Sequence, residues 1–190
     1  MHDSVQEFAV RLLNIDQITD QRVLEVGSRD VNGSVRSYVE SLKPQTYLGV
    51  DIEEGPCVDK IVDCEELTIM VGHNAWDLVI CTEVLEHVRD WRRCLNEMSK
   101  ALTDNGVLLL TTRSPGFPYH EHPCDYWRYP VEVMGTILAT LGMEELALES
   151  VPEAPGVFAC GRKVKPCGDL TAITVPTIAP PQPAELPAGL

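Results

Sequence analysis

Short apolar runs alternate along the chain with segments in which apolar residues recur every three or four positions. The first such segment places Val5, Phe8 and Leu12 on one side, and this spacing predicts an amphipathic helix capped by Asp3 or Ser4. Short runs dominated by apolar residues are typical of strands in a buried sheet. Five such runs occur, at residues 23–26, 46–52, 58–63, 76–81 and 107–112.

Helical periodicity occupies the intervals between these runs. It predicts helices over residues 31–42, 64–70, 90–102 and 130–141. Asn105 and Gly106 predict a turn into the fifth strand, and residues 144–150 and 156–164 are expected to pair antiparallel at the sheet edge. Strands that alternate with helices predict an α/β fold, with a mostly parallel sheet covered by helices on both faces.

The periodic pattern stops at Lys165. The last segment is rich in proline and nearly uncharged, so we expect residues 1–164 to form one domain and residues 165–190 an extended, disordered tail. Alternatively, the tail docks on a protein partner. A chain of this length fits one domain with a substantial core.

The charge balance disfavours a nucleic-acid partner. The chain has 29 acidic and 15 basic residues and a formal net charge of −14, which repels a phosphate backbone. Neither a signal peptide nor a membrane-spanning apolar run is visible, so no membrane association is expected. Seven cysteines, widely spaced and without a C-x-x-C pair, favour free thiols and a cytoplasmic location.

The turn after the first strand is the leading place for a cofactor. Gly27 permits a tight turn there, and Asp51 at the end of the second strand can accept hydrogen bonds from ribose hydroxyls. A dinucleotide fingerprint would need two more glycines, but Arg29 and Asn32 occupy those positions. The missing pyrophosphate loop favours a nucleoside cofactor without phosphates, such as S-adenosylmethionine. Arg29 must point away from that cofactor or reach over it.

The motifs of this chain follow one another in a known order. They are VLEVGSRDVNGS, YLGVDIEEG, VDCEEL, WDLVICTEVLEHVRD and ALTDNGVLLLTTRSPGFPYHEHPCDYWRY, between residues 23 and 129. With them the sequence resembles the class I S-adenosylmethionine-dependent methyltransferases, specifically the type 11 group that acts on small molecules. The resemblance implies a Rossmann-like, seven-stranded sheet whose last strand is antiparallel. The HEHPCDYWRY segment resembles methyltransferases of sugar and cell-surface polysaccharide biosynthesis.

The resemblance also implies positions for the cofactor site. The residues expected to bind S-adenosylmethionine are Glu25, Gly27, Ser28, Asp51, Ile52, Asp63, Cys64, Thr82 and Glu83. Asp51 would bind the ribose, Asp63 with the backbone of Cys64 the adenine edge, and Thr82 with Glu83 the methionine end. For Asp63 the alternative is a helix cap. For His87, which lies in EVLEHV, a structural role is the alternative to a chemical one.

The segment after the fifth strand is expected to cover the substrate. Tyr119, Tyr126 and Trp127 would form apolar walls, and Arg128 would hold an anionic group. His120 or His122 would act as general base toward a hydroxyl. An ordered surface crossover is the alternative.

Four residues of this segment could be metal ligands, namely His120, His122, Cys124 and Asp125. Structural zinc sites pair distant ligand clusters, and the sequence reveals no second cluster, so no metal is expected.

Together these features predict methyl transfer from S-adenosylmethionine to an oxygen or nitrogen of a small molecule. The resemblance of the last motif implies an acceptor related to sugars. Two alternatives stay open. One is a methyltransferase-like binding module without catalysis, which Arg29 keeps open. The other is a nicotinamide-dependent oxidoreductase, which the missing glycines and the terminal strand pair argue against.

Overall fold

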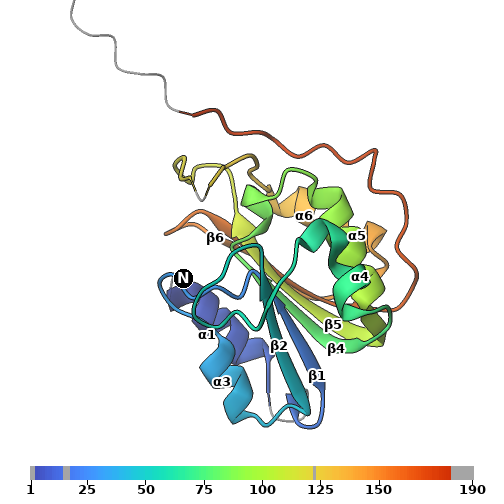
Figure 1. The fold of residues 1–190 in the computed structure, drawn as a ribbon. Helices are drawn as coiled ribbons and strands as arrows, with labels where there is room; N and C mark the ends of the chain where they lie inside the picture. Colours follow the sequence, from blue (N-terminus) through green and yellow to red (C-terminus); the bar gives the residue numbers. More distant parts are fainter. Residues whose placement is uncertain (1–2, 15–17, 122, 181–190) are drawn as a thin grey trace, which may run out of the picture.

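The computed structural model describes residues 3–14, 18–121 and 123–180 (Figure 1). In this part of the chain, seven strands form one sheet in the order β3-β2-β1-β4-β5-β7-β6. The strands are β1 (Arg22–Val26), β2 (Thr46–Asp51), β3 (Lys60–Ile61), β4 (Trp76–Thr82), β5 (Leu102–Arg113), β6 (Met143–Val151) and β7 (Gly156–Lys163). The helices are α1 (Asp3–Leu12), α3 (Arg36–Ser41), α4 (Leu67–Val71), α5 (Trp91–Ala101) and α6 (Val131–Thr140), with 3-10 turns η1 (Cys64–Glu66) and η2 (Leu85–His87).

The sheet is parallel except at β7. Strands β1 to β5 pair in parallel, whereas β7 runs antiparallel to both β5 and β6. The predicted α/β fold, with a mostly parallel sheet and an antiparallel last strand, is therefore confirmed. Parallel strands need crossover connections, and these place the helices on the two faces of the sheet.

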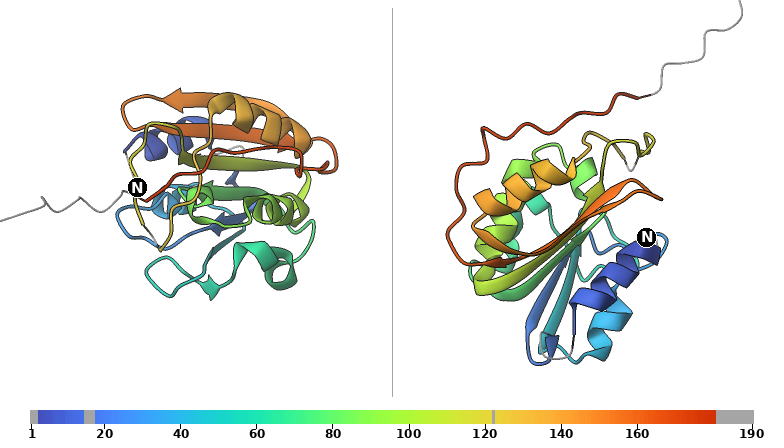
Figure 2. Two further views of the ribbon diagram at one scale, coloured as in Figure 1. Left: turned by 90° about the horizontal axis from the view of Figure 1, so that it is seen from above. Right: turned by 180° about the vertical axis from the view of Figure 1, so that it is seen from behind.

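Two hydrophobic layers lie on opposite faces of the sheet. Helices α1 and α3 cover one face, and α4, α5 and α6 cover the other (Figures 1 and 2). Alternation along each strand divides its side chains between the layers. In β1, Val23 packs in the layer of α1, where the rings of Phe8 and Phe158 are 5.3 Å apart. Leu24 packs in the other layer, with the fully buried Trp91 of α5.

Three predicted elements differ from the structure. The strand expected over residues 58–63 is limited to β3, Lys60–Ile61. The helix expected from residue 31 begins only at Arg36, because the chain first forms a loop in which Gly33 has a φ of 123° and donates a 2.7 Å hydrogen bond to Asp30. The expected turn at Asn105 lies inside β5, where residues 103–106 form an irregular excursion within the pairing with β4. Asn105 has a φ of 65°, which asparagine tolerates better than most residues.

The chain after β7 packs on the domain. Residues 165–180 are extended, as expected, but they do not separate from the domain (Figure 2). Leu170 and Val175 are 5% and 3% exposed and belong to the core on the α5 side. Arg92 of α5 donates hydrogen bonds to the carbonyls of Leu170 and Ile173. The segment thus differs from a disordered tail, and the prediction for residues 181–190 lies outside the described residues.

Two further expectations concern the whole chain. Within residues that the structure describes, no helix has the length and apolar character needed to span a membrane. All seven cysteines lie in the described part and are free thiols. Four of them are buried, namely Cys64, Cys81, Cys94 and Cys160, which confirms the expectation of free thiols.

Candidate active site

A cavity of about 790 Å³ lies at the carboxyl ends of β1, β2, β4 and β5. Ligands of open α/β sheets bind at this edge. The walls come from the turn after β1, the loop after β2, the end of β4 and the start of the crossover segment, which we define as residues 114–129. The crossover segment is drawn in yellow tones in Figure 1.

The turn after β1 brings the backbone very close to Val84, which follows β4. Gly27 has a φ of 77°, and its N–H donates a 2.8 Å hydrogen bond to the carbonyl of Val50. A Cβ atom at Gly27 would lie 2.1 Å from Cγ2 of Val84, so glycine is required both for conformation and for space. Gly27 and Ser28, which were predicted to bind the cofactor, both line the cavity.

The carboxylate of Asp51 lies at the cavity wall beside this turn. It accepts hydrogen bonds from the backbone N–H groups of Arg29 and Glu53, at 3.1 and 3.2 Å. The guanidinium of Arg29 forms an ion pair with Glu53 and packs on Gly55. Arg29 is therefore held by the loop after β2, and its backbone helps to fix Asp51.

Of the two residues predicted to contact the adenine, Cys64 lines the cavity and Asp63 does not. Val62, Cys64 and Ile52 line it, and Ile52 is 55% exposed. Asp63 is exposed and is not among the described residues that line the cavity. Its carboxylate accepts a 2.9 Å hydrogen bond from the N–H of Glu65 and caps η1. The structure thus gives Asp63 the cap role that was the alternative, because its side chain points to the start of η1.

Acidic residues line the inner end of the cavity. Glu25 is 1% exposed and accepts a 2.6 Å hydrogen bond from the hydroxyl of Tyr47. Burial raises the pKa of Glu25 to about 7, and the Tyr47 hydrogen bond opposes this rise only in part. Glu83, with a φ of 58°, accepts a 3.1 Å hydrogen bond from Thr111 and forms an ion pair with Arg113. Thr82 and Glu83, which were predicted to bind the cofactor, both line the cavity.

Arg128 does not have the substrate-binding position expected for it. The side chain is 4% exposed, and its N–H groups make five hydrogen bonds. Two of these, both 2.6 Å long, go to the carboxylate of Asp125, and three go to backbone carbonyls of the crossover segment. A guanidinium has five N–H donors, so none is left for a substrate anion. Arg128 holds the crossover segment in shape.

The three aromatic residues predicted as substrate walls are not among the described residues that line the cavity. Tyr119 donates a 2.7 Å hydrogen bond to Glu121, and Trp127 donates one of 2.8 Å to the carbonyl of Val88. Tyr126 pairs through its backbone with Glu86 and Ile178. Among the described residues of this segment, the cavity is lined instead by Phe117, Pro118, His120, Glu121 and Pro123. An irregular segment has no periodicity from which its inward face could have been predicted.

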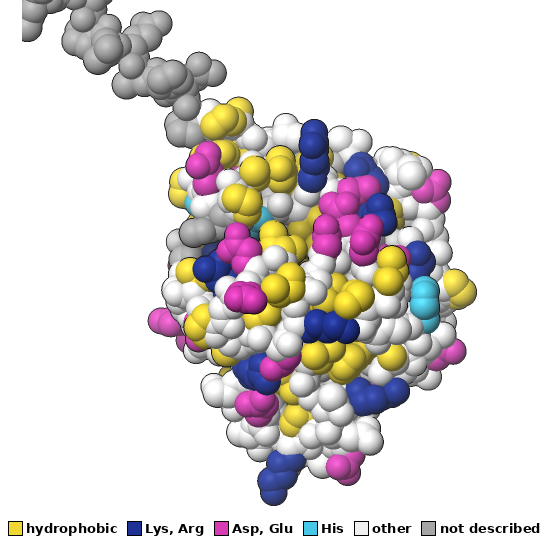
Figure 3. All heavy atoms as spheres, viewed as in Figure 1, with side chains coloured by type: hydrophobic (Ala, Val, Ile, Leu, Met, Phe, Trp, Pro, Cys, Tyr) yellow, Lys and Arg dark blue, Asp and Glu magenta, His cyan; other side chains and the backbone are white. Residues whose placement is uncertain are grey.

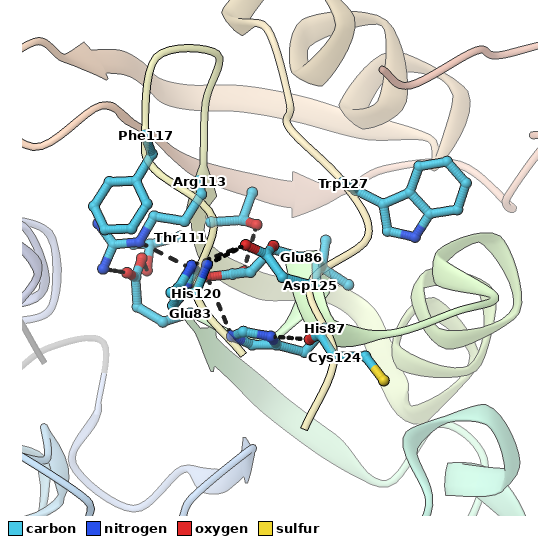
Figure 4. Close-up of polar contacts among 12 residues, drawn as sticks. Glu83, Glu86, His87, Thr111, Arg113, Phe117, His120, Cys124, Asp125 and Trp127 are labelled. Atoms are coloured by element: carbon cyan, nitrogen blue, oxygen red, sulfur yellow. Dashed lines mark hydrogen bonds and ion pairs between the residues drawn. The ribbon is translucent and has the colours of Figure 1, made fainter. Parts of the chain in front are cut away.

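His120 lines the cavity, and His87 and Glu86 of η2 lie next to it (Figure 4). Nδ1 of His120 lies 3.1 Å from Oδ2 of Asp125, and Nδ1 of His87 lies 2.5 Å from the carbonyl oxygen of Cys124. The two imidazole rings are in edge contact, with centroids 4.9 Å apart. Burial lowers the pKa of both histidines. His122, the other predicted base, lies outside the described residues.

Glu86 was not predicted as a site residue. Its side chain is fully buried behind the two histidines, and Oε2 accepts a 2.7 Å hydrogen bond from Thr112. Burial raises its pKa. The sequence carried one signal, an acidic residue between apolar positions directly after a buried strand, in EVLEHV.

Comparison with known families agrees with this architecture. The family described as "Methyltransferase domain" matches residues 1–144, about three quarters of the chain. The chain belongs to this methyltransferase family. The predicted resemblance to class I methyltransferases is thereby confirmed. The alternative of a nicotinamide-dependent oxidoreductase does not agree with this family. No curated protein matches the chain.

Several solved structures share the fold of this methyltransferase. An S-adenosylmethionine-dependent methyltransferase from Mesorhizobium loti aligns with a TM-score of 0.63 and 16% identity over 82% of this chain and 95% of its own. The 1,6-didemethyltoxoflavin-N1-methyltransferase from Burkholderia thailandensis aligns with a TM-score of 0.64 and 14% identity over 86% and 80%. Its structure holds 1,6-didemethyltoxoflavin and S-adenosylhomocysteine. The cyclase SpnF aligns with a TM-score of 0.66 and 16% identity over 87% and 80%. At these identities the likeness establishes the fold alone.

Proposed function

We propose that this methyltransferase moves the methyl group of S-adenosylmethionine to an oxygen or nitrogen of a small molecule. The observation that carries the proposal is the Gly27 turn beside the Asp51 carboxylate at one cavity, in a chain of the methyltransferase family. A close backbone turn followed by an acidic strand end suits an adenosine ribose. The Burkholderia relative, which binds S-adenosylhomocysteine, supports this choice of cofactor.

Asp51 is the proposed ribose ligand. An ionised carboxylate offers about four lone-pair sites, and the N–H groups of Arg29 and Glu53 use two of them. The remaining sites are available to the two ribose hydroxyls. The other proposed cofactor contacts at the cavity are Glu25, Gly27, Ser28, Ile52, Cys64, Thr82 and Glu83.

The proposed reaction is an in-line displacement at the sulfonium methyl. A lone pair of the acceptor forms the new O–C or N–C bond while the S–C bond breaks. The electron pair of that bond stays on sulfur and leaves the thioether S-adenosylhomocysteine, and the acceptor loses its proton to a base. Because the sulfonium is a strong electrophile, the protein mainly supplies alignment and a water-poor site. A cavity of about 790 Å³ has room for the cofactor and a small acceptor.

His120 is the proposed catalytic residue. Its Nδ1 faces the carboxylate of Asp125, which only accepts hydrogen bonds, so neutral His120 carries its proton on Nδ1. The lone pair on Nε2 is then available to the acceptor's proton. Asp125 is fixed by Arg128 and keeps the ring in this orientation.

A small molecule is a better acceptor than a nucleic acid. The net charge of −14 repels phosphates, and Figure 3 shows acidic and basic side chains interspersed on the face that it displays. The finer proposal of a sugar-related acceptor rests on the resemblance of residues 120–129 alone.

Calorimetry with purified protein tests the cofactor. S-adenosylmethionine and S-adenosylhomocysteine should bind, and NAD should not. Asp51→Ala should cost about 2–4 kcal/mol of cofactor affinity, because hydrogen bonds to a charged acceptor are lost. Asp63→Ala is the matched control and should cost about 1 kcal/mol or less, because its carboxylate caps η1. Equal, negligible losses at both positions would place the cofactor elsewhere.

Mass spectrometry with candidate metabolite pools tests the transfer itself. Products heavier by one methylene, together with S-adenosylhomocysteine, are expected. Once an acceptor is known, His120→Ala should lower methyl transfer roughly 100-fold and change cofactor affinity by less than about threefold. Cofactor binding without any methylated product would support the alternative of a binding module.

A further inference from the structure

Three ligand-type atoms of different residues converge beside the cavity (Figure 4). Oε1 of Glu86 lies 3.9 Å from Nε2 of His87 and 4.0 Å from Nε2 of His120. All three atoms lie within 4.8 Å of one another. In the described part of the chain, this is the one group of three or more such side chains with metal-ligand spacing. His87 and His120 line the cavity, and Glu86 lies behind them.

The hydrogen bonds of the two rings determine which nitrogen carries a lone pair. Nδ1 of His87 faces the carbonyl oxygen of Cys124, and Nδ1 of His120 faces Asp125. Both partners are acceptors, so in the neutral rings Nδ1 is protonated and Nε2 is not. Metal-binding histidines are oriented in this way, with the second nitrogen donating to a carbonyl or a carboxylate.

Glu86 has an oxygen that needs a partner. The residue is 0% exposed, and Oε2 is satisfied by Thr112. Oε1 has no hydrogen-bond donor among the described residues, and Nε of Arg113 is 3.8 Å away. A buried carboxylate oxygen without a donor is unfavourable. Here it lies 3.9 and 4.0 Å from the Nε2 atoms of two imidazoles. One carboxylate oxygen and two ring nitrogens in this arrangement are a donor set that suits a divalent cation.

We propose that Glu86, His87 and His120 bind one divalent transition-metal ion, with Zn²⁺ as the probe, at the inner wall of the cavity. Two imidazoles and one carboxylate are the protein ligands in one class of catalytic zinc site, which leaves a fourth position open. Bonds of about 2.1 Å in a tetrahedral site separate ligand atoms by about 3.4 Å. The observed separations of 3.9 and 4.0 Å from Glu86 must therefore shorten by about 0.5 Å. The two histidine nitrogens, which lie within 4.8 Å of each other, must also approach each other by side-chain rotation if they are farther apart than this.

The local charge permits such an ion. The guanidinium of Arg113 forms ion pairs with both Glu83 and Glu86, so two carboxylates share one guanidinium. One negative charge is left, which offsets half of the charge of a divalent cation. The ligands come from two distant parts of the chain, η2 and the crossover segment, so sequence spacing could not reveal the site.

The role of the ion rests on the proposed function, whereas its binding does not. The open position would hold an oxygen or nitrogen of the acceptor and favour its deprotonation. His120 would then act on the acceptor through the ion.

Calorimetry tests the site on the chelator-treated full chain, titrated with ZnCl₂ without cofactor. One ion per chain is expected, and Glu86→Gln or His120→Ala should weaken binding at least about tenfold. His73→Ala, at an exposed histidine, is the matched control and should bind like wild type. Circular dichroism identifies any variant that fails to fold, and His120 is the safer position because its side chain is 29% exposed.

Cobalt distinguishes this site from cysteine ligation. Co²⁺ held by nitrogen and oxygen ligands shows d–d bands without the near-ultraviolet thiolate charge-transfer band. Absence of stoichiometric binding, binding unchanged in Glu86→Gln and His120→Ala, or a thiolate band would overturn the proposal. Loss of S-adenosylmethionine binding would overturn only the proposed function, because the metal titration contains no cofactor.

Discussion

Arg128 donates one hydrogen bond of 2.6 Å to each carboxylate oxygen of Asp125, and both side chains are buried. The same carboxylate accepts hydrogen bonds from the backbone N–H and Nδ1 of His120. The position of His120 at the cavity therefore depends on the guanidinium of Arg128, which is not part of the cavity wall. The described residues around His120 form no helix or strand, so this buried polar network determines the conformation of the crossover segment there.

Arg128→Ala should destabilise the protein by about 3 kcal/mol, because Asp125 is left as a buried, unpaired charge. Urea denaturation measures the loss, and limited proteolysis should show faster cleavage within residues 114–125. Arg89→Ala, at an exposed arginine, is the control. A stable variant with an uncleaved crossover segment would mean that Arg128 does not organise it.

Gly27→Ala should both destabilise the fold and weaken cofactor binding. A Cβ at this φ of 77° costs about 1–2 kcal/mol, and the contact at 2.1 Å from Val84 adds steric strain. The double variant Gly27→Ala, Val84→Ala removes the contact but not the backbone strain, so it should recover only part of the loss. Full recovery of stability in the double variant would contradict the role of backbone conformation.

The architecture could be predicted because it follows from local patterns. Buried strands are predicted by the apolar runs of β1, β4 and β5. A helix that covers them is predicted by the 3.6-residue repeat of α5, without information from distant residues. The failures occur where local pattern is weak. The loop before α3 depends on a hydrogen bond from Gly33 to Asp30, and the docking of Leu170 depends on a surface formed by distant helices.

The residues that line the cavity were predictable at the sheet edge, whereas of the described candidates in the crossover segment only His120 lines it. Gly27, Asp51 and Thr82 lie at strand ends, where topology alone brings them together. Arg128 and Trp127 have side chains suited to a ligand, yet their partners are Asp125 and the carbonyl of Val88. The direction of each side chain is set by a particular hydrogen-bond partner, three residues away for Arg128 and 39 residues away for Trp127, and residue type alone does not identify that partner.

Stability should fall between pH 4.5 and 7 because of Glu25. Burial raises its pKa from 4.5 to about 7. Over this range the folded protein holds a proton that the unfolded chain has released, so the stability present below pH 4.5 is lost as the pH rises through 7. The difference is on the order of 3 kcal/mol.

Glu25→Gln keeps a hydrogen-bond acceptor for Tyr47 and cannot ionise, so it should flatten this part of the profile. Urea denaturation from pH 4 to 8 measures it. Glu145→Gln, at an exposed position of β6, controls for the loss of one negative charge. Parallel profiles for Glu25→Gln and wild type would show that Glu25 titrates normally.

Residues 165–180 should contribute to the stability of the domain, because they complete its core. Leu170 is 5% exposed within the hydrophobic cluster on the α5 side, and Arg92 holds its carbonyl at 3.2 Å. Leu170→Ala should cost about 2–4 kcal/mol, through lost apolar burial and the cavity that remains. Thr174→Ala, at an exposed position of the same segment, should change stability by less than about 0.5 kcal/mol.

The same segment pairs with the crossover segment, which extends the prediction to the cavity. The N–H of Arg128 donates to the carbonyl of Pro176, and the N–H of Ile178 donates to that of Tyr126. Hydrogen exchange should therefore speed up at Arg128 in Leu170→Ala as well as at residues 170–178, while amides of β1 and β4 stay protected. Unchanged exchange at Arg128, with unchanged stability, would mean that the chain after β7 only rests on the domain and does not brace the wall of its cavity.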